Sequence, residues 1–290
     1  MKDLKTIRGM PDLYDEEVER ISIVEKTCLE TFKSFNFQEF RTPVIENKSL
    51  FQRSVGESSD IIQKEVYEFE DRNGELLCLR PEGTAGLVRA LITNGLMNDE
   101  IKKFFYLGPM FRYERPQKGR KRQFFQAGAE LIGEESTKSD VEIILLAKTI
   151  LEKLGIKYSL EINYLGKDES LNSYRAYLRE YLKNYKDNLE DKVYSRLQRN
   201  PIRAIDSKDV KIKEIFEDAK DISAFLNNEE KESFVKTANS LKELKVKFSV
   251  NKKLVRGLDY YTGTVFEFTV DGLGSQNAVI GGGRYDNLIA

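Results

Sequence analysis

The sequence predicts an α+β fold in which helices flank an antiparallel sheet, with a mostly helical insertion. Apolar, aromatic-rich runs at 104–107 and 124–125 flank a basic loop and indicate two antiparallel strands. Runs at 66–69 and 76–79 enclose Asn73-Gly74, a dipeptide that favours a hairpin. Because the strands follow one another through hairpins and do not alternate with helices, an antiparallel sheet is favoured over a parallel one.

The first element is expected to be an amphipathic helix followed by a strand. Asp12 can cap this helix, which runs through acidic residues 15–17 that are favourable near a positive helix end. The strand covers 37–41 and ends at Thr42-Pro43. Five apolar residues recur at helical spacing and predict one buried helix face: Val18, Ile21, Val24, Cys28 and Phe32.

The middle of the chain changes from sheet to helix. An amphipathic helix is predicted at 138–154, ended by Gly155, and a strand at 156–164. Residues 168–245 are rich in Lys, Glu, Asn and Leu at helical spacing, which predicts the helical insertion. The sheet then resumes at 261–280 with a turn at Asp271-Gly272.

These elements predict three segments: 1–165 for the first part of a core, 166–250 for the insertion and 251–290 for the second part. A Rossmann unit is disfavoured, because Gly281-Gly282-Gly283 lacks the strand–GxGxxG–helix context and the downstream acidic residue.

Composition limits the partners. The 290 residues include 47 basic and 48 acidic side chains, so any contact with nucleic acid must come from local basic patches. Cys28 and Cys78 lie in apolar surroundings and are expected to be buried thiols. Without a long apolar run or a secretory signal, the sequence predicts a cytoplasmic protein with no membrane partner.

The chain contains no histidine. This excludes the usual general base, the usual zinc ligand and every Ser-His or Cys-His arrangement. Chemistry must therefore rest on carboxylates, arginines and tyrosines, and no metal site made of protein side chains is predicted.

The basic loop is the strongest functional signal. Between Arg112 and Arg122 six positions are Arg or Lys, and only Glu114 is acidic. Guanidiniums that emerge from a rigid sheet suit a polyphosphate, because the planar fork of Arg matches phosphate oxygens. A solvated hairpin is the alternative.

Four segments carry a family resemblance. They are residues 111–126, Arg80-Pro81-Glu82-Gly83-Thr84, residues 254–261 (LVRGLDYY) and residues 281–286 (GGGRYD). They resemble motif 2, the amino-acid-binding loop, the histidine-specific signature and the glycine-rich segment of histidyl-tRNA synthetases, a class II aminoacyl-tRNA synthetase family. The resemblance implies the class II antiparallel sheet and ATP-dependent activation of L-histidine for transfer to tRNA.

The resemblance also implies how ATP, accompanied by Mg²⁺, is bound. Arg112 and Arg256 are expected to hold the α-phosphate from two sides and to be the catalytic residues. Glu114 and Arg120 are expected to contact ATP as well. Arg115 and Lys118 belong to the basic loop that would attract the tRNA acceptor stem.

Histidine binding is assigned by the same resemblance. Glu82 and Thr84 are expected to receive the ammonium group, although the same residues could simply form a helix N-terminus. The remaining residues surround the imidazole: Glu130 and Tyr261 on its two nitrogens, Tyr260 lining the pocket and Gln126 nearby. A structural ion pair is the alternative for Glu130, because buried carboxylates need partners.

Motif 1 corresponds to the first helix, strand and proline, which implies a homodimer, whereas an ordinary helix–strand unit would have the same pattern. Histidine usually occupies the position of Phe125 in this family. We expect the Phe125 ring to be packed, and its presence puts hydrogen bonding near Gln126 and Glu130 in doubt.

The resemblance places motif 3 and an anticodon-binding domain beyond Ala290, so a catalytic-domain fragment is expected. Two other functions share this fold. One is the regulatory subunit of ATP phosphoribosyltransferase, and the other is a domain that senses uncharged tRNA. The presence of Arg112, Arg256 and residues 80–84 favours the enzyme.

Overall fold

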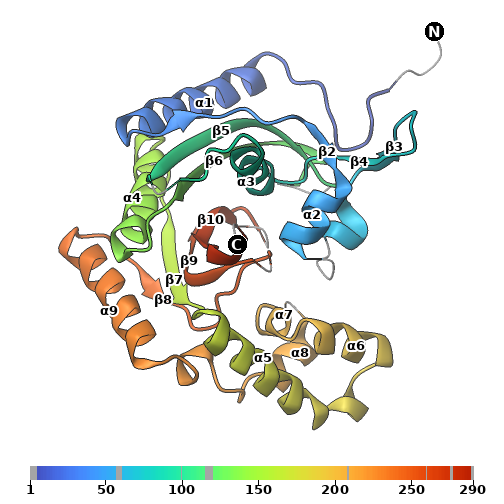
Figure 1. Cartoon of the computed structure of the whole chain (residues 1–290), viewed down its shortest axis with the longest axis vertical. Helices are drawn as coiled ribbons and strands as arrows, with labels where there is room; N and C mark the ends of the chain where they lie inside the picture. Colours follow the sequence, from blue (N-terminus) through green and yellow to red (C-terminus); the bar gives the residue numbers. More distant parts are fainter. Residues whose placement is uncertain are drawn as a thin grey trace. The chain divides into compact units, whose positions relative to one another are not determined.

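The computed structural model describes residues 5–56, 61–98, 100–114, 120–207, 209–258, 260–274 and 277–288. The chain forms two compact units (Figure 1). The first contains Met1–Lys157 and Asp271–Asn277, and the second contains Tyr158–Val270 and Ala278–Ala290.

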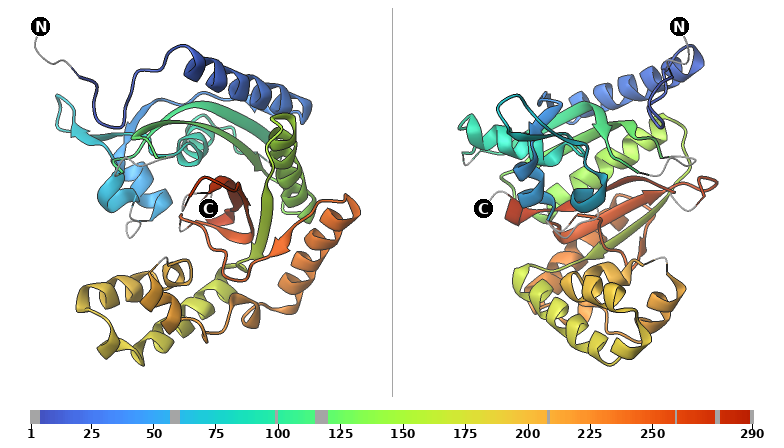
Figure 2. Two further views of the ribbon diagram at one scale, coloured as in Figure 1. Left: turned by 180° about the vertical axis from the view of Figure 1, so that it is seen from behind. Right: turned by 90° about the vertical axis from the view of Figure 1, so that its right-hand side faces the viewer.

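The first unit is built on a long hairpin of β5 (Lys102–Phe111) and β6 (Gln123–Ile132). The register runs from Lys102 opposite Ile132 to Phe111 opposite Gln123, which confirms the two strands predicted around the basic loop. β1 (Gln38–Glu39) pairs parallel to β5. α1 (Glu16–Ser34) and α4 (Thr137–Lys153) cover one face of this sheet (Figure 2).

A second, smaller sheet contains β2 (Ile45–Asn47), β4 (Leu76–Leu79) and β3 (Glu68–Glu70), all antiparallel. The β3–β4 turn confirms the predicted hairpin. Asp71 Oδ1 accepts hydrogen bonds from the backbone N–H of Asn73 and Glu75, and Gly74 has a φ of 81°. Three helical segments complete the unit: α2 (Lys48–Val55), η1 (Ile61–Glu65) and α3 (Thr84–Thr93).

Two predictions for the first helix are wrong. α1 begins at Glu16 and its N-cap is Asp15, whose φ of 48° breaks the helix there, so Asp12 lies outside it. Val18 and Val24 are 42% and 43% exposed. Only the second half of the apolar face, with Cys28 and Phe32, packs against the sheet and α4. The helical spacing predicted this apolar face but not which part of it would be buried.

Both cysteines are buried free thiols, as predicted. Burial raises the pKa of Cys28 and of Cys78 to about 11. Cys28 belongs to the core that holds α1 and α4 on the sheet, where Phe32 and Phe105 stack with ring centroids 4.8 Å apart.

The second unit contains a four-stranded sheet in the order β10-β9-β7-β8. Its strands are β7 (Ser159–Tyr164), β8 (Ser249–Val250), β9 (Thr262–Thr269) and β10 (Ala278–Arg284). Gly281, Gly282 and Gly283 lie inside β10, so they form no dinucleotide-binding turn. β7, from the first segment predicted from the sequence, pairs with β9, from the third. The division into three segments stays a prediction.

Helices occupy most of the chain between β7 and β8. They are α5 (Asp168–Lys183), η2 (Lys186–Asn188), α6 (Asp191–Arg199), α7 (Ile202–Ile205), α8 (Val210–Ile215), η3 (Ile222–Ala224) and α9 (Asn228–Glu243). A short η4 (Asp286–Leu288) follows β10. Glu230 ties two helix starts together, because its carboxylate accepts from Lys167 N, Ser170 Oγ and Asn227 N.

Candidate active site

Glu130 lies on the face of the β5–β6 hairpin that points away from α1. It is 6% exposed, and its Oε1 accepts a hydrogen bond from Thr84 Oγ1 at 2.7 Å. Tyr106 donates its hydroxyl to the same oxygen at 3.3 Å. The carboxylate is therefore held by two hydroxyl groups that come from the start of α3 and from β5.

Glu82 closes the same cluster at the N-terminus of α3. Its carboxylate accepts from Thr84 N at 2.7 Å and from Ala85 N at 2.9 Å, so Glu82, not Thr84, supplies the side-chain cap. Burial raises the pKa of the Glu82 carboxyl, although these two hydrogen bonds and the charge of Arg112 lower it. The cluster thus contains two buried carboxylates, one at an electropositive helix end.

Tyr106 was not predicted from the sequence. Its ring fits between two glycines, because a Cβ at Gly83 would lie 2.2 Å from its Cε2 and a Cβ at Gly128 2.1 Å from its Cζ. Gly128 stands directly opposite Tyr106 in the register. The pairing of an aromatic residue with a glycine across the hairpin would have pointed to Tyr106, but it can be recognised only once the strand register is known.

Arg112 follows β5 and lies on the Glu130 face by strand alternation. Its Nε donates to Pro81 O at 2.9 Å, and its guanidinium lies 5.2 Å from the centroid of the Phe124 ring. Arg112 is thus anchored to the loop that carries Glu82. Arg80, also missed, is 7% exposed and donates to Pro109 O and Thr42 O at 3.0 Å each.

The two other predicted ATP ligands contact each other. Arg120 Nη1 lies 2.5 Å from Glu114 Oε2, and Arg122 Nε donates to Glu114 O at 3.1 Å. The predicted loop residues Arg115 and Lys118 lie outside the described residues.

Phe125 and Gln126 point to opposite faces of β6. Gln126 alternates with Glu130 on the site face, whereas Phe125 faces α1 and is 42% exposed. The expectation that Phe125 is packed is therefore wrong. Its position also removes the expected disturbance near Glu130, since the ring lies on the other side of the strand.

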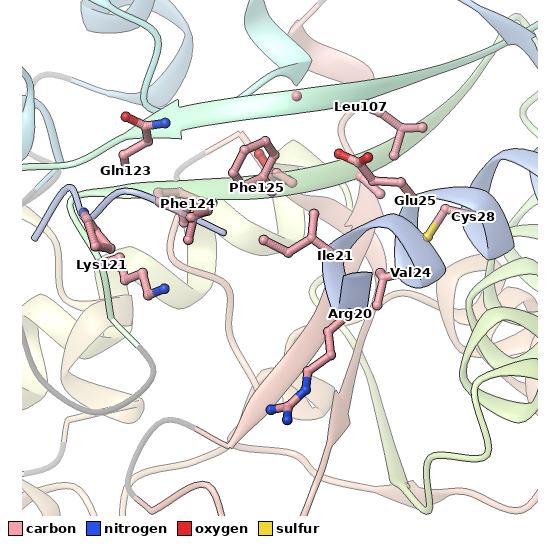
Figure 3. Close-up of a pocket in the computed structure, with 15 residues that line it drawn as sticks. Arg20, Ile21, Val24, Glu25, Cys28, Leu107, Lys121, Gln123, Phe124 and Phe125 are labelled. Atoms are coloured by element: carbon pink, nitrogen blue, oxygen red, sulfur yellow. The ribbon is translucent and has the colours of Figure 1, made fainter. Parts of the chain in front are cut away.

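Phe125 borders a cavity of about 590 Å³ between α1 and the hairpin (Figure 3). Ile21, Val24, Cys28 and Leu107 contribute to its mostly apolar lining. The cavity explains why half of the apolar face of α1 is accessible in the single chain.

The remaining predicted residues belong to the second unit. Arg256 forms an ion pair with Glu267, and its guanidinium lies 6.0 Å from the centroid of the Tyr261 ring. Tyr260 is 7% exposed and packs on Tyr261 with ring centroids 4.6 Å apart. Glu267 was missed because a carboxylate on an alternating strand is ordinary in sequence. Asp259 of the same signature lies outside the described residues.

The predicted site residues thus form two groups, one in each unit. The first unit brings together Glu82, Thr84, Glu130 and Arg112 beside Gln126, and the second brings together Arg256, Tyr260 and Tyr261. In the described part of the chain, no cluster of three or more acidic or Cys side chains could hold a metal ion. In that same part, no helix is long and apolar enough to cross a membrane.

Comparisons with known proteins decide the family. The family model described as histidyl-tRNA synthetase matches residues 9–290. The chain belongs to the histidyl-tRNA synthetase family. A histidine--tRNA ligase of Prochlorococcus marinus (strain MIT 9515) is 47% identical over 291 residues, which cover 100% of this chain and 68% of that protein.

Two solved structures agree with the fold. Apo histidyl-tRNA synthetase of S. aureus matches with a TM-score of 0.77 at 32% identity, covering 99% of this chain and 67% of that one. A Bacillus halodurans protein, titled as an ATP phosphoribosyltransferase regulatory subunit/histidyl-tRNA synthetase, matches at 0.71 and 22% identity. The match covers 100% of this chain and 78% of that protein, and it supports the fold alone. The predicted α+β class II architecture is confirmed.

Proposed function

We propose that this chain activates L-histidine with ATP to form histidyl-adenylate and transfers the histidyl group to its tRNA. The observation that carries the proposal is the buried cluster of Glu82, Thr84 and Glu130 beside Arg112. Two buried carboxylates suit a ligand with an ammonium and an imidazole N–H, and a neighbouring guanidinium suits its phosphate-bearing partner.

In activation, the histidine carboxylate attacks the α-phosphorus, an O–P bond forms, and the bond to pyrophosphate breaks. No covalent enzyme nucleophile is needed, so a chain without histidine can perform the step. Arg112 and Arg256 stabilise the charge that grows on the phosphoryl oxygens, since fixed cations need no reorganisation during the reaction. Mg²⁺ bound with ATP would neutralise phosphate charge, and it would be held largely by the phosphates.

Recognition of the amino acid would use residues of both groups. Glu82 binds the ammonium group of histidine, with Thr84 beside it, and Glu130 and Tyr261 bind the two ring nitrogens. Tyr260 lines the pocket, and Gln126 lies near it. Because Tyr106 and Thr84 already hold one oxygen of Glu130, the carboxylate is oriented before histidine enters, which lowers the ordering cost of binding.

The partners follow from two surfaces. Val18, Ile23 and Val24 expose apolar surface on α1, and Val24 lines the Phe125 cavity, which supports a homodimer formed through the motif 1 region. The basic residues around Arg120 and Lys121 support contact with the phosphates of a tRNA acceptor stem. The cytoplasmic location stays a prediction from the sequence.

A regulatory role in an ATP phosphoribosyltransferase complex is the second candidate, favoured only by the fold shared with the Bacillus halodurans protein. Such a subunit needs histidine binding but no activation. Histidine-dependent exchange of pyrophosphate into ATP separates the two functions. We expect exchange by the parent chain and a loss of exchange in Arg112→Ala. Histidine binding by calorimetry without any exchange would instead support the regulatory function.

A further inference from the structure

The surroundings of Arg256 suggest how this guanidinium is fixed. Arg256 follows the buried Val255, and its own side chain is 20% exposed. Its Nη1 donates to Glu267 on β9, and a Cβ at Gly281 on β10 would lie 2.1 Å from its Nη2. The side chain is therefore enclosed by two neighbouring strands of the second unit.

Glu267 and Gly281 stand directly opposite each other in the β9–β10 register. Residues in direct opposition on antiparallel strands share one face of the sheet. Glu267 therefore supplies a carboxylate on that face, while Gly281 leaves the neighbouring space open. Gly281 is not among the glycines with positive φ, so close approach of the guanidinium, not backbone conformation, requires a glycine there.

Several nearby charges act on the Glu267 carboxylate. Burial raises the pKa of Glu267, and the carboxylates of Asp206 and Glu161 raise it further, whereas Arg256 lowers it. The positive charge of Arg256 offsets part of this concentration of negative charge. Among the described residues its Nε is buried and has no hydrogen-bond partner.

We infer that Glu267 and Gly281 are positioning residues that hold the Arg256 guanidinium in its phosphate-binding geometry. The inference rests on the proposed function of Arg256. Glu267 fixes one edge of the guanidinium by an ion pair, and Gly281 keeps the space beside β10 open for it. A donor held in place stabilises a transition state better than a mobile one, because the ordering cost falls before the reaction.

The kinetic test uses Glu267→Gln and Gly281→Ala in histidine-dependent pyrophosphate exchange. Both should lower kcat by roughly ten- to a hundredfold, the scale for misplacing a reacting group, with the KM for histidine little changed. Glu142→Gln is the matched control, since the Lys103–Glu142 pair has side-chain exposures of 25% and 29% against 20% and 22% for Arg256–Glu267. It should leave kcat unchanged.

A double-mutant cycle separates positioning from a merely structural role. If Glu267 acts through Arg256, Glu267→Gln should have no further effect on kcat in an Arg256→Ala background. Full additivity of the two effects, or a Glu267→Gln variant with the kcat of the parent, would overturn the inference.

A readout independent of activity is the side-chain Nε–Hε NMR signal of Arg256, assigned by its loss in Arg256→Lys. In the parent, this signal should be that of an ordered side chain. In Glu267→Gln and Gly281→Ala, motion of the side chain should average it. A mobile Arg256 in the parent would refute the positioning role. An ordered Arg256 in a parent without exchange activity would refute the proposed function and leave the held geometry standing.

Discussion

The two faces of the β5–β6 hairpin share one backbone and differ in chemistry. The face toward α1 and α4 carries Phe105, Leu107 and Leu131 and forms a core, whereas the other face carries Tyr106 and Glu130. Strand alternation lets one hairpin anchor itself and build a polar site. The polar face needs more supporting groups, because a buried carboxylate is costly unless hydrogen bonds satisfy it.

The largest difference between the faces should appear at Arg112. Arg112→Ala removes a cation that is held by Pro81 O and by the Phe124 ring. Histidine-dependent pyrophosphate exchange should fall by roughly a hundredfold or more, the scale for one preorganised charge-stabilising group. Lys103→Ala removes a cation from the opposite face of the hairpin and should leave the rate unchanged. Equal losses in the two folded variants would contradict the division into faces.

Gly128→Ala tests the space that Tyr106 needs. The added Cβ would overlap the Tyr106 ring, so the free energy of unfolding should decrease by about 3 kcal/mol, near the upper end for overpacking. Histidine binding should weaken too, since Tyr106 helps to hold Glu130. Ala127→Ser, one residue along on the other face, should change stability by less than about 0.5 kcal/mol. Urea unfolding of both variants measures the contrast.

Glu130→Gln keeps the shape of the side chain and can still accept from Thr84 and Tyr106, but it loses the charge. Histidine binding should weaken by about 1.5–3 kcal/mol, the range for a hydrogen bond to a charged group. Calorimetry with L-histidine gives the measurement. Unchanged affinity, with normal unfolding behaviour, would show that Glu130 is structural.

The hairpin could be predicted from the sequence because the apolar, aromatic-rich runs on both sides of the basic loop are local signals. The cluster around Glu130 could not be derived that way: Thr84 and Glu130 are far apart in the chain, and only the family resemblance brought them together. Tyr106 and Glu267 were missed because an aromatic or a carboxylate on a strand is ordinary until the register shows the glycine opposite it.

The same reasoning explains the errors at the first helix. Asp12 and Asp15 are equally suitable as helix N-caps by residue type. The positive φ of Asp15 ends the preceding backbone there, so the helix begins after Asp15. Helical spacing predicted an apolar face on α1 but carries no information about what covers it. The exposed half of that face lies beside the cavity at Phe125.

Phe125→Ala should show the smallest effect. A fully buried phenylalanine would cost about 3–5 kcal/mol on truncation. The Phe125 ring is 42% exposed. Fully burying a phenylalanine side chain contributes about 1.5–3 kcal/mol, so losing the part that is still buried should lower the free energy of unfolding by about 1–2 kcal/mol. Histidine affinity should not change, because the ring lies across the strand from Glu130.

If a second copy covers the cavity, the variant should instead weaken self-association, which sedimentation at several concentrations measures. A loss of histidine affinity equal to that of Glu130→Gln would contradict the separation of the two faces, since Phe125 would then act on the site through the strand.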